Sequence, residues 1–331
     1  MHNLPTGVFS MLVWTVPYIM FLLGLVMLVK GGDWFVDASV WTARVTGLPE
    51  VIIGATIVSI ATTLPELFVS SIASFEGHPD IAIGNAVGSV ICNTGLVLGV
   101  TTLISPSRII NPRIFCLNGL LLAAYGSFFC YLAADGMIGK TDSALLLLLF
   151  TVYILTNIAI IRYKKTDAGL RDEISLQPCL QDTIKNLVKF LIGITFIVLG
   201  ADMLVEYGSA IALHIGVPER VISLTLIALG TSLPELATSL SALVKGHKFI
   251  SMGNIVGANI LNFSMVMGVS SHFADIPIKP HTLYLDLPVT ALLIAMLLVP
   301  CLIKKKTSRP QSALMVSIYA AYILLLGYLH L

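Results

Sequence analysis

Two glutamates carry the most distinctive chemistry that this sequence could support. Glu66 follows the segment Ser-Ile-Ala-Thr-Thr-Leu-Pro, and Glu235 follows Ala-Leu-Gly-Thr-Ser-Leu-Pro, each near the middle of a long apolar stretch. A charged side chain at the centre of a membrane helix costs about 2.5 to 3.5 kcal/mol on insertion scales. Two carboxylates at equivalent depths therefore call for a partner, and a bound cation would compensate both.

Oxygen atoms of several kinds lie within one helical turn of each glutamate. A proline directly precedes each glutamate, and proline lacks the N–H that would bond to the carbonyl four residues earlier, at Ala61 or Gly230. The freed carbonyl oxygens can point into a cavity. Thr62 and Thr231 stand four residues before the glutamates, so each hydroxyl shares a helical face with a carboxylate. We therefore expect a site built from oxygen atoms alone.

A polar segment follows each glutamate motif at the same distance. The first reads Gly-Asn-Ala-Val-Gly-Ser-Val-Ile-Cys-Asn, and the second reads Gly-Asn-Ile-Val-Gly-Ala-Asn-Ile-Leu-Asn. Ser89, Asn93 and Asn262 in these segments offer neutral oxygen atoms that could complete a Ca²⁺ shell or hold Na⁺. The glycines, and the first asparagine of each segment, are interpreted as residues that permit close helix packing.

The kinds of ligand in these motifs predict which ion they bind. Ca²⁺ takes six to eight oxygen ligands in a flexible geometry, and two carboxylates would neutralise its double charge. Softer metals prefer Cys or His, and neither proline–glutamate motif contains one. The five cysteines imply neither a disulfide framework nor a zinc site. We therefore expect Ca²⁺ as a transported ion and no resident cofactor.

Both glutamate motifs belong to an internal repeat. Shifting the chain by 169 residues aligns its two halves without a gap. Besides the glutamates, the shift pairs Asp33 with Asp202, Pro49 with Pro218, Glu50 with Glu219, Thr56 with Thr225, Pro65 with Pro234, Asn85 with Asn254, Gly88 with Gly257, and Asn93 with Asn262. Each half carries five apolar stretches, an odd number, so the second copy must enter the membrane from the opposite side. Inverted repeats are characteristic of secondary transporters, which bind their substrate near the midplane between the halves.

The composition of the chain places these motifs in a lipid bilayer. Of its 331 residues, 56% are hydrophobic and 11% are charged, against about 25% charged in an average soluble domain. Apolar stretches long enough to cross roughly 30 Å of hydrocarbon are centred near residues 21, 62, 92, 124, 152, 194, 232, 261, 292 and 321. We therefore predict an all-α integral membrane protein with ten transmembrane helices in two inverted five-helix repeats. Residues 1–162 would form the first repeat, 163–185 a cytoplasmic linker and 186–331 the second repeat of one membrane domain.

The positive charges are distributed unevenly and predict the orientation. Placing the amino terminus outside puts 16 of the 19 Lys and Arg on one side, and leaves Lys140, Arg220 and Lys279 on the other. Cytoplasmic loops carry such an excess, so we expect both termini on the extracytoplasmic side of a prokaryotic inner membrane. The formal net charge of +1 gives no general argument for binding nucleic acid.

These motifs resemble those of the cation/Ca²⁺ exchanger superfamily, specifically its short prokaryotic sodium/calcium exchanger type with two alpha repeats. The resemblance covers nearly the whole chain and rests on Thr-Thr-Leu-Pro-Glu and Gly-Thr-Ser-Leu-Pro-Glu, each followed by Gly-Asn-x-x-Gly. It implies that the two glutamates bind Ca²⁺, assisted by Thr62 and Thr231. It also implies Na⁺ positions lined by Thr63, Ser232, Ser89 and the backbone carbonyls of Ser59 and Ala228. The first and sixth helices would then be a sliding gate.

The chain departs from the pattern of this exchanger type, mainly in its second half. Similar exchangers commonly have serine and aspartate where this chain has Ala258 and Asn262, so one hydroxyl and one carboxylate are missing. In the first half, Ala61 and Thr63 replace the usual glycine and serine, which retains the hydroxyl. These differences leave open whether Na⁺ or H⁺ drives the exchange.

Other classes of function fit the sequence less well than an antiporter that exchanges Ca²⁺ for Na⁺ or H⁺. The first alternative is a proton-coupled exchanger of divalent cations. A passive cation channel would also want buried carboxylates, but usually arranges them as rings between subunits. No Gly-x-x-x-x-Gly-Lys phosphate loop is present, so no nucleotide partner is expected. The apolar stretches carry no nucleophile–base arrangement, so the chain is not expected to be an enzyme, and the sequence does not fix its oligomeric state.

Four further ionisable residues form repeat pairs without an evident ligand. Asp33 and Asp202 lie near the ends of apolar stretches and are interpreted as solvated interface residues. His78 and His247 each follow a glycine in a short loop, so a solvated turn is the favoured interpretation.

Overall fold

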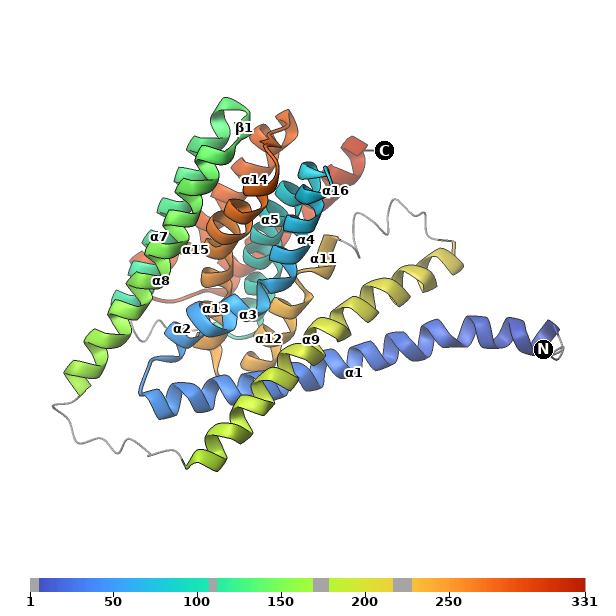
Figure 1. Cartoon of the computed structure of the whole chain (residues 1–331), viewed down its shortest axis with the longest axis horizontal. Coiled ribbons are helices and arrows are strands. Elements are labelled where there is room, and N and C mark those ends of the chain that lie inside the picture. The colour runs from blue at the N-terminus through green and yellow to red at the C-terminus, as the bar shows by residue number, and fades with distance from the viewer. Residues whose placement is uncertain (1–5, 107–111, 169–178, 217–227, 331) are drawn as a thin grey trace.

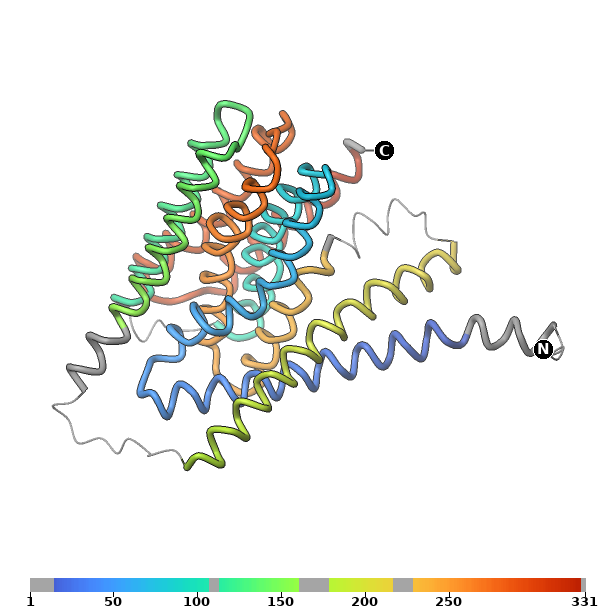
Figure 2. Tube along the Cα trace, in the orientation of Figure 1, coloured from blue at the N-terminus to red at the C-terminus, as the bar shows by residue number. Residues whose placement is uncertain are grey.

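Helices make up almost all of the structure. The computed structural model describes residues 6–106, 112–168, 179–216 and 228–330 (Figures 1 and 2). The first half contains α1 (Thr6–Thr46), α2 (Glu50–Ile53), η1 (Gly54–Val58), α3 (Ser59–Thr62), α4 (Leu64–Phe75), α5 (Pro79–Cys92), η2 (Asn93–Leu98), α6 (Gly99–Ile104), α7 (Pro112–Leu132), η3 (Ala133–Asp135), β1 (Met137–Ile138) and α8 (Lys140–Ala168). The second half contains α9 (Leu180–His214), α11 (Ala228–Gly230), α12 (Leu233–Val244), α13 (Lys248–Leu261), η5 (Asn262–Val266), α14 (Met267–Phe273), β2 (Ile276–Pro277), η6 (Thr282–Asp286), α15 (Leu287–Lys304) and α16 (Arg309–His330). The η elements are π-helical turns except for η3, a 3₁₀ turn, and β1 pairs with β2 in antiparallel fashion.

The predicted all-α membrane fold is confirmed, although the number of spans is established only in part. Eight described helices are long and apolar enough to cross a membrane, and a ninth span results if the bent pair Glu50–Thr62 and Leu64–Phe75 counts as one. The sequence predicts ten. The difference lies at the apolar stretch centred near residue 232, because residues 217–227 are outside the described part and α12 is a shorter apolar helix.

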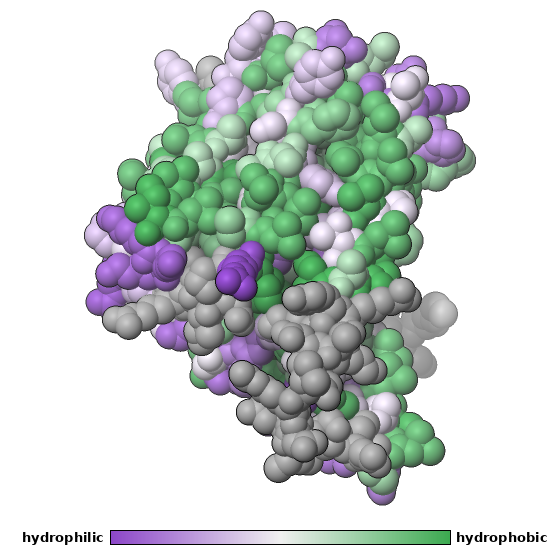
Figure 3. Space-filling model, turned by 90° about the vertical axis from the view of Figure 1, so that its left-hand side faces the viewer, coloured by the Kyte–Doolittle hydropathy of each residue, from purple (hydrophilic) through white to green (hydrophobic). Residues whose placement is uncertain are grey.

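The surface of the molecule is suited to contact with lipid. Hydrophobic residues cover most of the described part of the face shown in Figure 3, and hydrophilic residues gather toward its edges. Large apolar side chains such as Leu22, Phe68 and Leu324 are more than half exposed. Exposed apolar area on this scale is unfavourable in water but matches a bilayer environment.

The long helices α1 and α9 lie side by side and cross at close range along one side of the main bundle, where α1 also packs on α12 (Figure 1). Glycines allow this approach. A Cβ atom added to Gly31 would come within 2.8 Å of the Gly193 carbonyl oxygen, and one added to Gly200 would come within 2.7 Å of the Gly24 carbonyl oxygen. Small residues at such crossings let helix backbones pack directly in a membrane.

The main bundle surrounds α13. The membrane span that contains α13, Lys248–Phe273, is the most buried of the described spans, with 94% of its apolar segment inside the protein. It contacts η1, α2, α3, α7 and α12, so it links elements from both halves of the chain. Its buried polar residues therefore face the interior of the bundle and not lipid.

Described helices enter the predicted linker, residues 163–185, from both sides. α8 continues to Ala168, and α9 begins at Leu180. Polar residues beyond the bilayer can extend a membrane helix into water, and hydropathy does not detect such an extension.

Candidate functional site

Both proline–glutamate motifs interrupt a helix in the same way. Thr63, between α3 and α4, has φ −83° and ψ −2°, and its repeat partner Ser232, before α12, has φ −88° and ψ 1°. The two helical parts on either side of Thr63 meet at a bend of 41°. Proline at the start of the second part causes the break, because it cannot donate to the preceding turn. Each glutamate therefore lies in the first turn of a new helix, where the helix dipole favours a negative charge.

Glu66 and Glu235 are completely buried, and Glu66 lies within electrostatic range of Glu235. None of their four carboxylate oxygens has a hydrogen-bond partner. Buried polar groups in proteins are normally paired, and an unpaired buried carboxylate is costly. The carboxylate pair therefore fits a cation or protons as its partner. Because the two glutamates come from different halves of the chain, an ion bound between them would contact both halves.

Side chains from the opposite half lie next to each glutamate or its threonine. The Thr62 side chain lies beside Glu235, and its hydroxyl donates to Asn254 Oδ1 over 3.1 Å. In the other half, the Thr231 hydroxyl donates to Asn85 Oδ1 over 2.9 Å. Because each hydroxyl hydrogen points at an amide oxygen, the lone pairs of the hydroxyl remain available to a cation.

Each of the two amides that receive these hydrogen bonds is held by the neighbouring broken helix of its own half, α4 for Asn85 and α12 for Asn254. The Asn85 Nδ2 donates to the Glu66 carbonyl oxygen over 3.2 Å and to Ser70 Oγ over 2.9 Å. The Asn254 Nδ2 donates to Thr238 Oγ1 over 3.1 Å. The sequence had indicated only packing for Asn85 and Asn254. Their occurrence as a repeat pair was the signal that could have indicated an orienting role.

Asn93 and Asn262 occupy matching places at the start of the π-helical turns η2 and η5. Both are fully buried, and the amide oxygen and nitrogen of each have no hydrogen-bond partner. A π-helical turn inside an α-helix is uncommon and frequently occurs at functional sites. Ala258, one turn before Asn262, is also fully buried and brings only a methyl group.

The remaining predicted ligands differ in how free their oxygens are. The Thr63 hydroxyl is buried without a partner, and Ser89, which faces Glu66, lies 3.5 Å from the Ser232 hydroxyl. The Ser59 carbonyl already accepts from the Thr63 N–H over 2.9 Å. The corresponding Ala228 carbonyl receives no such bond, because the Ser232 N–H donates to Leu229 instead.

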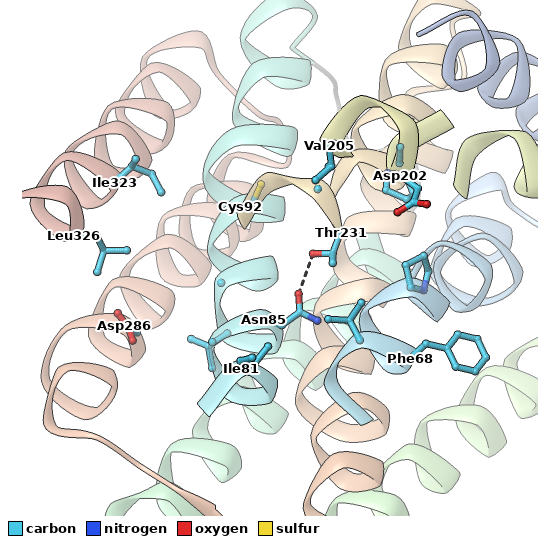
Figure 4. A pocket seen from close by; sticks show the side chains of 18 of the residues that line it. Phe68, Ile81, Asn85, Cys92, Asp202, Val205, Thr231, Asp286, Ile323 and Leu326 are labelled. Carbon is cyan, nitrogen blue, oxygen red and sulfur yellow. Dashed lines mark hydrogen bonds between the residues drawn. The ribbon is translucent and has the colours of Figure 1, made fainter. Parts of the chain in front are cut away.

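A cavity of about 800 Å³ leads to these motifs. Its walls come from α4, α5, α9, α12 and α16, and the hydrogen bond between Thr231 and Asn85 lies in its wall (Figure 4). Pro65 and Pro234 also line it, so it reaches both broken helices. On the wall opposite α9, the Tyr322 hydroxyl donates to Asp286 Oδ1 over 2.9 Å. Asp286 was not among the predicted site residues, although an acidic residue inside the apolar stretch centred near 292 was a usable signal.

Two of the charged repeat residues are paired in the structure. Lys245 lies 2.7 Å from Asp37 and 3.7 Å from Asp33, which was expected to be solvated. His247 was likewise expected in a solvated turn, but its Nδ1 lies 2.7 Å from a Glu50 carboxylate oxygen. Asp202 lines the cavity. In the described part of the chain, no group of three or more His, Cys, Asp or Glu residues could hold a metal ion.

Comparison with known proteins identifies the family. The profile of the family described as "Sodium/calcium exchanger protein" matches residues 16–159 and 185–328, two segments with the same 169-residue offset that aligns the halves. The sodium/calcium exchanger MaX1 of Methanosarcina acetivorans is 30% identical over 95% of this chain and 99% of its own. An uncharacterized membrane protein of Methanocaldococcus jannaschii is 35% identical over 90% of this chain and 94% of its own. The solved structure of the sodium-calcium exchanger NCX_Mj soaked with 10 mM Na⁺ and zero Ca²⁺ superimposes with a TM-score of 0.81 at 32% identity, covering 94% of this chain and 98% of that one. The chain therefore belongs to the sodium/calcium exchanger protein family.

Proposed function

We propose that this protein is a secondary antiporter that exchanges Ca²⁺ for Na⁺ across a membrane by alternating access. The observation that carries the proposal is the pair of completely buried glutamates whose carboxylate oxygens have no hydrogen-bond partner. Protein carboxylates in this state are stabilised by a cation. Family membership and the likeness to NCX_Mj support Na⁺ and Ca²⁺ as the exchanged ions.

The donor set of the site is suited to a Ca²⁺ ion that must bind and leave again. The carboxylates of Glu66 and Glu235 neutralise the double charge of Ca²⁺, and the hydroxyls of Thr62 and Thr231 add neutral oxygens. Two charges and several neutral ligands meet the requirement of Ca²⁺ for many oxygen atoms. No cysteine or histidine competes for a softer metal in either motif.

The Na⁺ positions are assigned to neutral oxygens on both sides of this centre. Their proposed ligands are Thr63, Ser232, Ser89, Asn93, Asn262 and the backbone carbonyls of Ser59 and Ala228. The Ala228 carbonyl is the stronger ligand of the two, because the Ser59 carbonyl already accepts a hydrogen bond from the Thr63 N–H.

The finer architecture also belongs to the proposal. Ten spans would form two inverted repeats, residues 1–162 and 186–331, with the stretch centred near residue 232 as the seventh span. Both termini would face the extracytoplasmic side of a prokaryotic inner membrane. The matched hydrogen bonds of Thr62 and Thr231, each to an asparagine of the other half, support the repeat.

A proton-coupled exchange is a second candidate for the driving ion. The residue that would account for proton coupling is Asn262. It stands where similar exchangers have aspartate, and its amide has no hydrogen-bond partner. One fewer carboxylate lowers the negative charge available to hold Na⁺ beside Ca²⁺.

Transport by the purified protein in liposomes tests the proposal. Uptake of ⁴⁵Ca²⁺ is measured under a Na⁺ gradient, an H⁺ gradient or no gradient, with Glu66→Gln and Glu235→Gln beside the wild type. Asp182→Asn, at the exposed start of α9, is the matched control for loss of one acidic group. We expect uptake that follows the Na⁺ gradient, is abolished in both glutamate variants and persists in the control. Uptake without any gradient would indicate a channel, and no uptake by a folded wild type would refute the antiporter.

A further inference from the structure

The two halves of the chain are not in the same conformation where α1 and α9 meet the bundle. We name two contacts by their helices: the α1–α12 seam and the α9–α4 seam, which are exchanged by the 169-residue shift. The α1–α12 seam is closed. α1 packs along α12, and a Cβ atom on Gly32 would come within 2.7 Å of Ser241 Oγ and 3.2 Å of the Ala237 carbonyl oxygen.

The α9–α4 seam is open in this structure. The residues that the shift assigns to it, Ala201 on α9 and Phe68 on α4, line the cavity, as does the neighbouring Val69 (Figure 4). Phe68 is 59% exposed, whereas its repeat partner Ala237 is 8% exposed. One seam is thus a packed contact while its repeat partner is a wall of the cavity.

A lysine joins the two helices of the closed seam. Lys245, the residue that ends α12, donates from Nζ to the Asp33 carbonyl oxygen and to Asp37 Oδ1, both over 2.7 Å. Its side chain is 25% exposed, so these bonds are partly shielded from water. Hydrogen bonds to charged groups contribute more than neutral ones. Among the ion pairs found in the described ranges, those of Lys245 alone connect α1 with α12.

At the open seam, the same three positions carry acids only. The shift places Glu76 at the position of Lys245, Asp202 at that of Asp33, and Glu206 at that of Asp37. The backbone at the end of α4 matches that at the end of α12, since Glu76 has φ −79° and ψ 1° and Lys245 has φ −80° and ψ −1°. The Glu76 side chain therefore extends from its backbone in the same direction as the Lys245 side chain. A carboxylate, however, cannot donate a hydrogen bond to another carboxylate or to a carbonyl oxygen.

We propose that Lys245 is a positioning residue for transport, which holds the α1–α12 seam closed by its hydrogen bonds to α1. Its repeat partner Glu76 is acidic and cannot form equivalent hydrogen bonds across the α9–α4 seam. The inference rests on the proposed function, in which the two seams close alternately. Closing the α9–α4 seam as tightly as its partner would bring Glu76 toward Asp202 and Glu206, and like charges repel. The conformation with the α9–α4 seam open is therefore the resting state.

Charge exchange between the two positions tests this asymmetry. The variants are Lys245→Glu, Glu76→Lys and the double variant, which exchanges the two residues without changing the net charge. Lys248→Glu, three residues beyond Lys245, is the matched control, because Lys248 makes none of the ion pairs found in the described ranges.

The readout is the rate at which a water-soluble maleimide labels one introduced cysteine at each seam. The five native cysteines are first replaced, and Val69→Cys or Ser241→Cys is added to protein in nanodiscs without Ca²⁺ or Na⁺. Val69 lines the cavity and is 41% exposed, while Ser241 is 9% exposed at the closed seam. We expect fast labelling at position 69 and slow labelling at position 241 in the parent protein.

The expected result is a reversal of these rates. Glu76→Lys should slow labelling at position 69 and speed it at position 241 by about tenfold, the scale of one hydrogen bond to a charged group. The double variant should show the fullest reversal, and Lys248→Glu none. General loosening of the fold would speed labelling at both positions, which would refute the proposal, as would unchanged rates in folded Glu76→Lys protein. Labelling does not require transport, so the result is independent of whether the protein exchanges Ca²⁺ for Na⁺.

Discussion

The two asparagines that orient the site threonines should contribute unequally to Ca²⁺ binding. Asn254 is 1% exposed and accepts from Thr62, whereas Asn85 accepts from Thr231 in the wall of the cavity, where water can enter. In Asn254→Ala, the Thr62 hydroxyl loses its amide partner in a dry environment and keeps only the longer contact of 3.4 Å to the Ser59 carbonyl oxygen. Leaving a buried polar group poorly paired costs about 1 to 3 kcal/mol. In Asn85→Ala, water can replace the lost partner, so the cost approaches the net value of about 1 kcal/mol for one hydrogen bond.

These magnitudes convert into affinities that can be measured. A free-energy change of about 1.4 kcal/mol is tenfold in affinity, so we expect Asn254→Ala to weaken Ca²⁺ binding by about tenfold or more. Asn85→Ala should weaken it by only a few-fold. Calorimetric titration of purified protein with Ca²⁺ gives both values, and thermal unfolding of each variant without Ca²⁺ shows whether the fold is retained. An equal or larger loss in Asn85→Ala would refute the argument from burial.

Two further predictions concern the helix that follows each broken helix. Gly257→Ala should destabilise the protein by about 1 to 3 kcal/mol, the usual cost of overpacking, because the added methyl group would lie 2.6 Å from Ser59 Oγ and 2.7 Å from the Ala55 carbonyl oxygen. Its repeat partner Gly88 has open space, so Gly88→Ala should unfold at or slightly above the temperature of the wild type, since alanine is favoured over glycine inside a helix. Equal unfolding temperatures for the two variants would contradict this prediction. Asn262→Asp adds a carboxylate at a proposed Na⁺ ligand and should lower the Na⁺ concentration that gives half-maximal ⁴⁵Ca²⁺ exchange, with Asn262→Leu as the uncharged control. An unchanged Na⁺ dependence in the aspartate variant would separate Asn262 from Na⁺ binding.

Much of the fold could be predicted because it follows from strong local signals. Proline at positions 65 and 234 predicts a helix break, and the structure has one directly before each. Long apolar stretches predict membrane helices, and most of them are present. The depth of Glu66 and Glu235 in these stretches predicted their complete burial.

Other features depend on tertiary contacts that the sequence does not show. The π-helical turns at Asn93 and Asn262 begin within ordinary helical sequence, so nothing local distinguishes them. His247 follows a glycine in a short loop, and only the approach of Glu50 from another helix gives it a partner. A repeat with the same motifs in both halves also cannot indicate which seam is closed, because that difference belongs to one conformation.

The glycine-lined crossing of α1 and α9 determines how the protein can move. With Gly31 against Gly193 and Gly24 against Gly200, the two backbones interlock at two places along their length. Sliding one helix past the other would press each glycine against the facing backbone, so the two helices must move together as one rigid body. A displacement that brings α9 onto α4 then carries α1 away from α12 in the same stroke. The two seams are thereby prevented from being open together, and this mutual exclusion is what distinguishes an exchanger from a leak.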